Sequence, residues 1–176
     1  MGQYYKPAFL SKNKKGVQAW VYSHDYGSGL KLMEHSWMLS EFVGAVENLL
    51  MPHGKFYKTP IVWAGDYADN DLKTNVYDRC KDKNKIEPPK GVIDPLYRYI
   101  VNHTKKEYVD KMLSPDVDGW RIHPLPLLTC EGNGRGGGDF GGEDQFNIIG
   151  SWARNVISIE KMIPEGYELI NFDLVE

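Results

Sequence analysis

Alternating hydrophobic and polar residues mark several short segments of the chain as β-strands. The segments Tyr4 to Leu10 and Val17 to Ser23 flank the turn-forming residues 11–16, and together they predict a β-hairpin. The segments Leu96 to Asn102 and Glu107 to Met112 flank a short polar turn and predict a second hairpin. Further strands are expected at residues 60–64, 120–123, 125–130, 152–160 and 167–175.

A helical period replaces this alternation between residues 36 and 51. Apolar residues recur there at spacings of three and four, on one face of a helix: Leu39, Phe42, Val43, Val46, Leu49 and Leu50. Ser36 is the expected N-cap, and Pro52 helps to end the helix. A short helix is also expected over Leu72 to Cys80. One long amphipathic helix among strands in hairpin order predicts a single α+β domain over residues 1–176, with a mostly antiparallel sheet.

Composition narrows the classes of function. The net charge of −3 gives no strongly basic surface, so bulk nucleic-acid binding is not expected. Cys80 and Cys130 lie far apart without a CxxC pair, which argues against a zinc site or a disulfide scaffold. A polar N-terminus and the lack of an apolar run of about 18 residues predict a cytoplasmic protein without a leader or membrane span. Residues 70–91 mix lysines with acidic residues and predict a charged surface insertion.

A glycine-rich loop at residues 131–144 is the strongest candidate for a binding site. Seven of the eleven residues from Gly132 to Gly142 are glycine, so neither a helix nor an ordinary strand is expected there. Backbone N–H groups and one arginine could cradle an anion. The candidate ligand-binding residues are Gly132, Asn133, Gly134, Arg135, Gly136, Gly137, Gly138 and Asp139. The alternative is a long hairpin loop, or a flap that orders when something binds.

Arg121 and His123 are candidates to support this loop. They alternate with Trp120 and Ile122, so both are expected on one face of a strand that leads toward the loop. An arginine and a histidine beside an anion cradle would suit phosphate recognition. Equally, they could form the solvent face of an antiparallel sheet.

A second motif, Val62 to Asp69, resembles one block of the calcineurin-like metallophosphoesterases. In that family a carboxylate at a strand end bridges two metal ions, so the resemblance implies a divalent-metal site. The candidate ligands are Asp66 and Asp69, joined by His24 and Asp25. The other ligand blocks of that family are absent. The alternative is a strand-to-turn transition in which Asp66 caps the turn and Asp69 is solvated.

Larger blocks of the sequence resemble a family of small proteins of tailed phages and bacterial mobile elements, for which no activity is known. They are residues 2–6, 30–35, 63–69 and 122–139. The resemblance implies the cytoplasm of a bacterial cell or of a phage-infected host. The resemblance brings no activity with it, but a phage origin would favour a role against host defence, such as inhibiting a protein or sequestering a nucleotide signal.

The leading hypothesis from the sequence is binding of a phosphate-bearing small molecule, such as a nucleotide. The glycine-rich loop would hold the phosphates, and Tyr or Trp rings would stack on a base. The alternatives are a metal-dependent phosphoesterase and a phage-type module that binds or inhibits another protein. Whether the protein is an enzyme is left open by the sequence.

Overall fold

The computed structural model describes residues 3–91, 94–132 and 148–172. The strands are β1 (Tyr5–Leu10), β2 (Val17–Val21), β3 (Thr59–Gly65), β4 (Lys85–Ile86), β5 (Tyr99–Asn102), β6 (Glu107–Asp110), β7 (Asp116–Val117), β8 (Trp120–Arg121), β9 (Cys130–Glu131), β10 (Val156–Glu160) and β11 (Glu168–Leu169). The helices are α1 (Leu32–His35), α2 (Glu41–Leu50), α3 (Val76–Arg79) and α4 (Pro124–Thr129), with 3-10 turns η1 (Ser23–Tyr26), η2 (Asp82–Asn84) and η3 (Lys111–Leu113).

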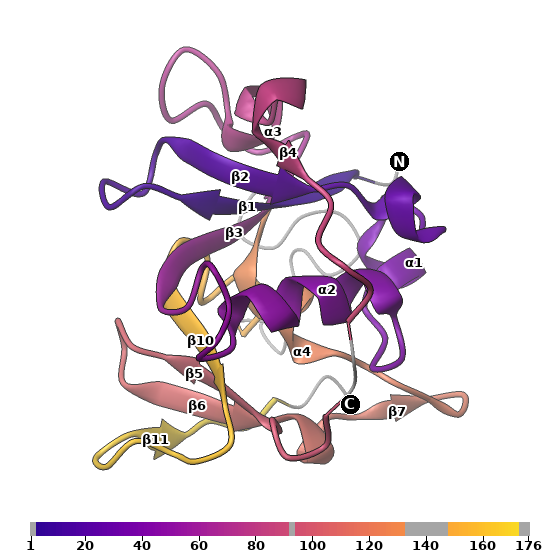
Figure 1. Ribbon diagram of the computed structural model, residues 1–176, viewed down its shortest axis with the longest axis vertical. Coiled ribbons are helices and arrows are strands. Elements are labelled where there is room, and N and C mark those ends of the chain that lie inside the picture. Colours follow the sequence, from indigo (N-terminus) through magenta and orange to yellow (C-terminus); the bar gives the residue numbers. More distant parts are fainter. Residues whose placement is uncertain (1–2, 92–93, 133–147, 173–176) are drawn as a thin grey trace.

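One mixed sheet of nine strands dominates the described part of the chain. Its order is β11-β6-β5-β10-β3-β1-β2-β4, and β9 pairs with β3 off this path. Most neighbours are antiparallel, whereas β4, β9 and β11 each pair in parallel. Figure 1 shows β1, β2 and β3 in the upper half of the molecule and β5, β6 and β11 in the lower half, with α2 between them. An α+β architecture with a mostly antiparallel sheet is therefore confirmed.

The main hydrophobic core lies on the face of the sheet that α2 and α4 cover. Alternation along β1 turns Tyr5 and Phe9 toward this core, where they join Trp63 of β3 and Phe42 of α2. Phe9 stacks on Phe56, with ring centroids 4.3 Å apart. Three leucines of α4 complete the packing: Leu125, Leu127 and Leu128.

A smaller core lies on the opposite face of β1, β2 and β3. Ala8 and Leu10 of β1 point to this face and pack with Trp20 of β2. Val76 and Cys80, which belong to the charged segment 70–91, cover them from outside. The segment therefore contributes buried apolar side chains to the fold, in addition to its exposed charges.

The expected long helix from Ser36 is not confirmed. Helix α2 spans ten residues, and Ser40 is its N-cap, because its Oγ accepts a hydrogen bond from the Val43 N–H at 3.3 Å. The preceding residues are held elsewhere: Trp37 forms a β-bridge with Ile122, and the Met38 N–H donates to the Arg121 carbonyl.

The prediction of a strand at 125–130 is wrong, because residues Pro124–Thr129 form helix α4. Pro124 occupies the first turn, where a missing N–H costs nothing, and His123 caps the helix. The helix is buried on all sides, so its sequence carries no alternation of polar and apolar residues that would separate it from a buried strand.

The two expected hairpins are confirmed as β1–β2 and β5–β6. The strands expected at 120–123 and 152–160 are shorter than predicted, since β8 ends at Arg121 and β10 begins at Val156. The short helix expected over 72–80 is confirmed over four residues as α3.

Among the described residues, no helix has the length and apolar character needed to cross a membrane.

Candidate functional site

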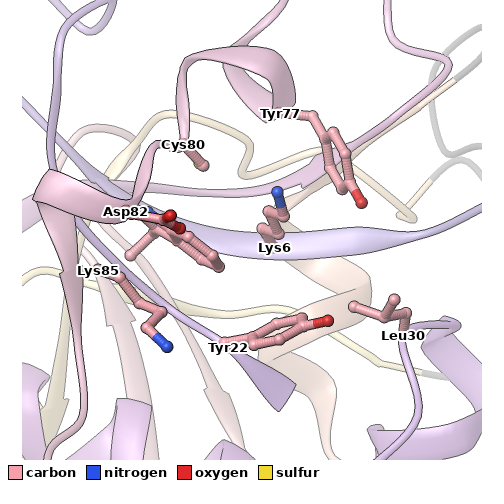
Figure 2. A pocket seen from close by; sticks show the side chains of 8 residues that line it. Lys6, Tyr22, Leu30, Tyr77, Cys80, Asp82 and Lys85 are labelled. Carbon is pink, nitrogen blue, oxygen red and sulfur yellow. The ribbon is translucent and has the colours of Figure 1, made fainter. Parts of the chain in front are cut away.

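A pocket of about 260 Å³ opens on the outer face of the sheet (Figure 2). It lies between β1, β2 and the segment that runs from α3 to β4. Its walls combine three aromatic rings, two lysines and three other side chains: Trp20, Tyr22, Tyr77, Lys6, Lys85, Leu30, Cys80 and Asp82. Aromatic walls with a few polar groups are typical of small-molecule sites.

Strand alternation places Lys6 in this pocket. Tyr5 and Phe9 of the same strand point into the main core, so Lys6 emerges on the opposite face. Its cross-strand partner on β3 is Ala64, whose short side chain leaves room above the sheet. Figure 2 shows the Lys6 side chain rising from β1 into the pocket, beneath Tyr77 and Cys80.

Aromatic rings surround the Lys6 ammonium group. Its Nζ lies 4.6 Å from the centroid of the Trp20 ring and 4.2 Å from that of Tyr77, within the range of cation–π attraction. Among the described residues, Lys6 forms no ion pair with a carboxylate. Burial lowers the pKa of Lys6 below its ordinary value of 10.5.

Lys85 supplies a second ammonium group at the pocket wall. Its Nζ lies 5.7 Å from the centroid of the Tyr22 ring and 3.4 Å from Asp25 Oδ2. The Tyr22 hydroxyl is 2.9 Å from His24 Nδ1. His24 and Asp25, two residues of the predicted metal site, therefore border this pocket and interact with its walls.

Tyr77 and Cys80 stay protonated at neutral pH. Burial raises the pKa of each side chain to about 12, since the charged form would lose its hydration. The Trp20 indole is fixed by a hydrogen bond from Nε1 to the Lys81 carbonyl at 2.7 Å. The pocket thus presents oriented, uncharged aromatic walls around the Lys6 cation.

The other two predicted metal ligands lie in the turn after β3. Asp66 Oδ1 accepts a hydrogen bond from the Tyr4 N–H at 3.0 Å, and Asp69 is exposed. This is the arrangement expected of a strand-to-turn transition. Within the described residues, no group of three or more His, Cys, Asp or Glu side chains could hold a metal ion. The metal hypothesis gains no support there.

Arg121 and His123 do not share a strand face, because β8 ends at Arg121. Arg121 Nη1 donates to the carbonyls of Met112 and Ser114, at 2.7 Å and 3.0 Å. His123 is fully buried, and its Nδ1 accepts a hydrogen bond from the Leu125 N–H at 3.2 Å. Both side chains have structural partners, and their role in binding phosphate stays a prediction.

His123 belongs to a buried charge cluster that sequence reasoning missed. Glu47 Oε1 lies 2.6 Å from His123 Nε2, and Glu47 Oε2 pairs with the Lys111 ammonium group. Burial alone would raise the pKa of Glu47, but His123 and Lys111 outweigh it and lower the pKa to about 2. The signal was the position of Glu47 on the apolar face of α2, next to Val46 and three residues before Leu50.

Most of the predicted glycine-rich site, residues 133–144, lies outside the described residues. Gly132 is described, and it follows β9, which pairs with β3. A Cβ atom added at Gly65 of β3 would lie 2.7 Å from the Glu131 carbonyl oxygen, so only glycine fits at this crossing. Anion binding by the glycine-rich loop stays a prediction.

An ion-pair network that the sequence did not predict holds the start of that loop. Arg154 pairs with both Glu131 oxygens, at 2.8 Å and 2.6 Å, and with Asp71 at 2.6 Å. Arg79 pairs with both Asp71 oxygens, at 2.7 Å and 3.0 Å. Burial would raise the pKa of Asp71, but the two arginines outweigh it and hold the pKa well below its usual range. The network ties β9 to the segment 70–91.

Comparison of the chain with protein-family models, with curated proteins and with solved structures found no match. The resemblance to proteins of tailed phages therefore stays a prediction.

Proposed function

We propose that this protein binds a small anion that carries a planar aromatic ring, of which a nucleotide is the common example. The site is the pocket lined by Lys6, Trp20 and Tyr77. The observation that carries the proposal is the Lys6 ammonium group, which is half-buried among aromatic rings and forms no ion pair with a carboxylate of the described residues.

The charge of Lys6 favours an anionic ligand. A partly desolvated ammonium group loses hydration, and an ion pair with a phosphate or carboxylate would restore its electrostatic stabilisation. Burial lowers the pKa of Lys6 and so expresses this loss of hydration. Lys85 adds a second positive charge at the wall, although Asp25 partly neutralises it, and Asp82 repels anions from its own part of the pocket.

The rings favour a planar ligand. Trp20, Tyr22 and Tyr77 line one cavity, and Trp20 is fixed by its bond to the Lys81 carbonyl. Aromatic side chains that are already oriented lose little conformational entropy when a base or another flat ring stacks on them. Charge and rings together fit a nucleotide better than they fit inorganic phosphate or a nucleoside alone.

Isothermal titration calorimetry tests the proposal with three kinds of probe: nucleoside 5′-monophosphates, the corresponding nucleosides and inorganic phosphate. At least one nucleotide should bind more tightly than its nucleoside and than phosphate. Lys6→Met should weaken nucleotide binding at least about tenfold, because one charge-assisted contact is lost. Affinity should also fall at high pH, from a pH below 10.5, as Lys6 loses its proton.

Lys161→Met is the matched control, because Lys161 also lies over a ring, 4.8 Å from the Tyr97 centroid, but does not line the pocket. It should bind nucleotide as the wild type does. Equal affinity for nucleotides and nucleosides, or an unchanged affinity in Lys6→Met, would contradict the proposal.

A further inference from the structure

We propose that Lys6 is a nucleophilic amine that forms an imine with an aromatic aldehyde carrying an anionic group. The inference rests on the proposed function, because the aldehyde would enter the same pocket. It adds a covalent step to binding and names the substrate class as aromatic aldehydes with a phosphate or carboxylate.

Three side chains of the pocket could act as nucleophiles: the Lys6 amine, the Tyr77 phenol and the Cys80 thiol. Burial disfavours the charged form of each, with opposite consequences for reactivity. The reactive forms of tyrosine and cysteine are anions, and burial raises the pKa of both to about 12. The reactive form of lysine is the neutral amine, and burial lowers the pKa of Lys6. Of the three side chains in this pocket, burial therefore favours the reactive form only of Lys6.

The aromatic rings that flank Lys6 would also stabilise the imine product. A protonated imine keeps the positive charge at Nζ, which lies 4.6 Å from the Trp20 centroid and 4.2 Å from the Tyr77 centroid. The cation–π attraction that stabilises the ammonium group would then stabilise the iminium group as well. Lys85 lines the same cavity and can face the anionic group of the ligand.

The reaction balances without an oxidant, a reductant or a metal. The neutral Nζ of Lys6 attacks the aldehyde carbon, and one N–H proton passes to the former carbonyl oxygen to give a carbinolamine. The hydroxyl group then takes up one proton from solvent and leaves as water, which forms the C=N bond of the protonated imine with the remaining N–H proton still on Nζ. Hydrolysis by the reverse route restores free Lys6 and the aldehyde.

Pyridoxal 5′-phosphate is the test probe, because it combines a planar ring, a phosphate and an aldehyde. Pyridoxine 5′-phosphate has an alcohol in place of the aldehyde and reports binding without imine formation. The protein is mixed with the aldehyde near neutral pH, reduced with borohydride, and mapped by peptide mass spectrometry. The label should appear at Lys6 before it appears at Lys161 or at any other lysine.

Lys6→Arg is the matched variant, since it keeps a cation in the pocket but cannot form the imine. It should lose the label at position 6 and the visible absorbance of the imine, and it should still bind pyridoxine 5′-phosphate. If the alcohol binds the wild type but the aldehyde labels Lys6 no more than Lys161, the imine inference is wrong and the proposed function stands. If neither compound binds but a nucleoside 5′-monophosphate does, the imine inference fails and the proposed function stands. If none of these compounds binds in the pocket, both proposals fail.

Discussion

Two lysines, Lys111 and Lys6, are shielded from solvent in contrasting environments. Lys111 is 7% exposed, and its ammonium group pairs with Glu47, which His123 contacts on the other side. Lys6 is half-buried, and its ammonium group faces the rings of Trp20 and Tyr77. The first cation has a buried carboxylate partner within the fold, whereas the second forms no ion pair with a carboxylate among the described residues.

The contrast separates a structural charge from a binding charge. The Lys111–Glu47–His123 cluster links η3, α2 and the start of α4, so removing one member leaves an uncompensated charge in the core. Removing the Lys6 charge breaks no ion pair in the described part of the protein, because Asp78 and Asp82 attract Lys6 without pairing with it. The first site should therefore respond to mutation in stability and the second in ligand binding.

The largest expected effect is at Glu47. Glu47→Gln leaves the Lys111 ammonium group buried without its counter-ion, and it should lower the free energy of unfolding by about 3–5 kcal/mol. Urea denaturation at neutral pH measures this loss. Glu41→Gln is the control on the same helix, because Glu41 is exposed in its pair with Lys90, and it should cost at most about 1 kcal/mol. Similar losses in both variants would contradict the structural role of the cluster.

Acid should remove the contribution of Glu47 to the free energy of unfolding. Its pKa is lowered from 4.5 to about 2, so its stabilisation is present above pH 4.5 and is lost as the pH falls toward 2. The shift corresponds to about 3 kcal/mol. His35, whose pKa burial lowers from 6.5 to about 4, makes stability fall over a higher window, between pH 6.5 and 4. The difference between wild type and Glu47→Gln isolates the lower window, and parallel acid profiles would refute the assignment.

A smaller effect is expected at the network that holds the segment 70–91. Asp71→Asn weakens the ion pairs with Arg79 and Arg154, and it should cost about 1–2 kcal/mol, because these side chains are partly exposed. Asp69→Asn makes the same substitution at an exposed residue and should change stability by less than about 0.5 kcal/mol. Equal unfolding midpoints for both variants would show that the network adds nothing to stability.

Apart from the control variants, the smallest change in stability is expected at Lys6. Lys6→Met removes two cation–π contacts, each worth about 0.5–1 kcal/mol, but it also removes the penalty for a half-buried charge. The two effects oppose each other, so the free energy of unfolding should change by less than about 1 kcal/mol. A loss as large as that of Glu47→Gln, measured in the same urea series, would make Lys6 a structural residue and break the comparison.

Much of the fold is predictable from local patterns in the sequence. The hairpins β1–β2 and β5–β6 follow from alternation and turn residues, because both signals are local. Helix α4 and the start of α2 were mispredicted for tertiary reasons. α4 is buried on all sides, and the bridge from Trp37 to Ile122 keeps residues 37–40 out of the helix.

The candidate pocket could not be predicted, because its residues come from separate elements between Lys6 and Lys85. Only His24 and Asp25, at its border, were named from the sequence as candidate site residues. Alternation places Lys6 on the outer face of β1, but no local pattern shows that α3 covers that face and carries Tyr77 over it. Glu47 carried a readable signal, a carboxylate on the apolar face of an amphipathic helix.

Thermal unfolding with and without a nucleoside 5′-monophosphate, for the wild type and Lys6→Met, tests the central claim most directly. A ligand that binds only the folded state raises the melting temperature. We expect nearly equal melting temperatures without ligand, and a rise on adding nucleotide that occurs in the wild type and is lost in Lys6→Met. A low melting temperature of Lys6→Met without ligand, or an equal rise in both proteins, would contradict the account.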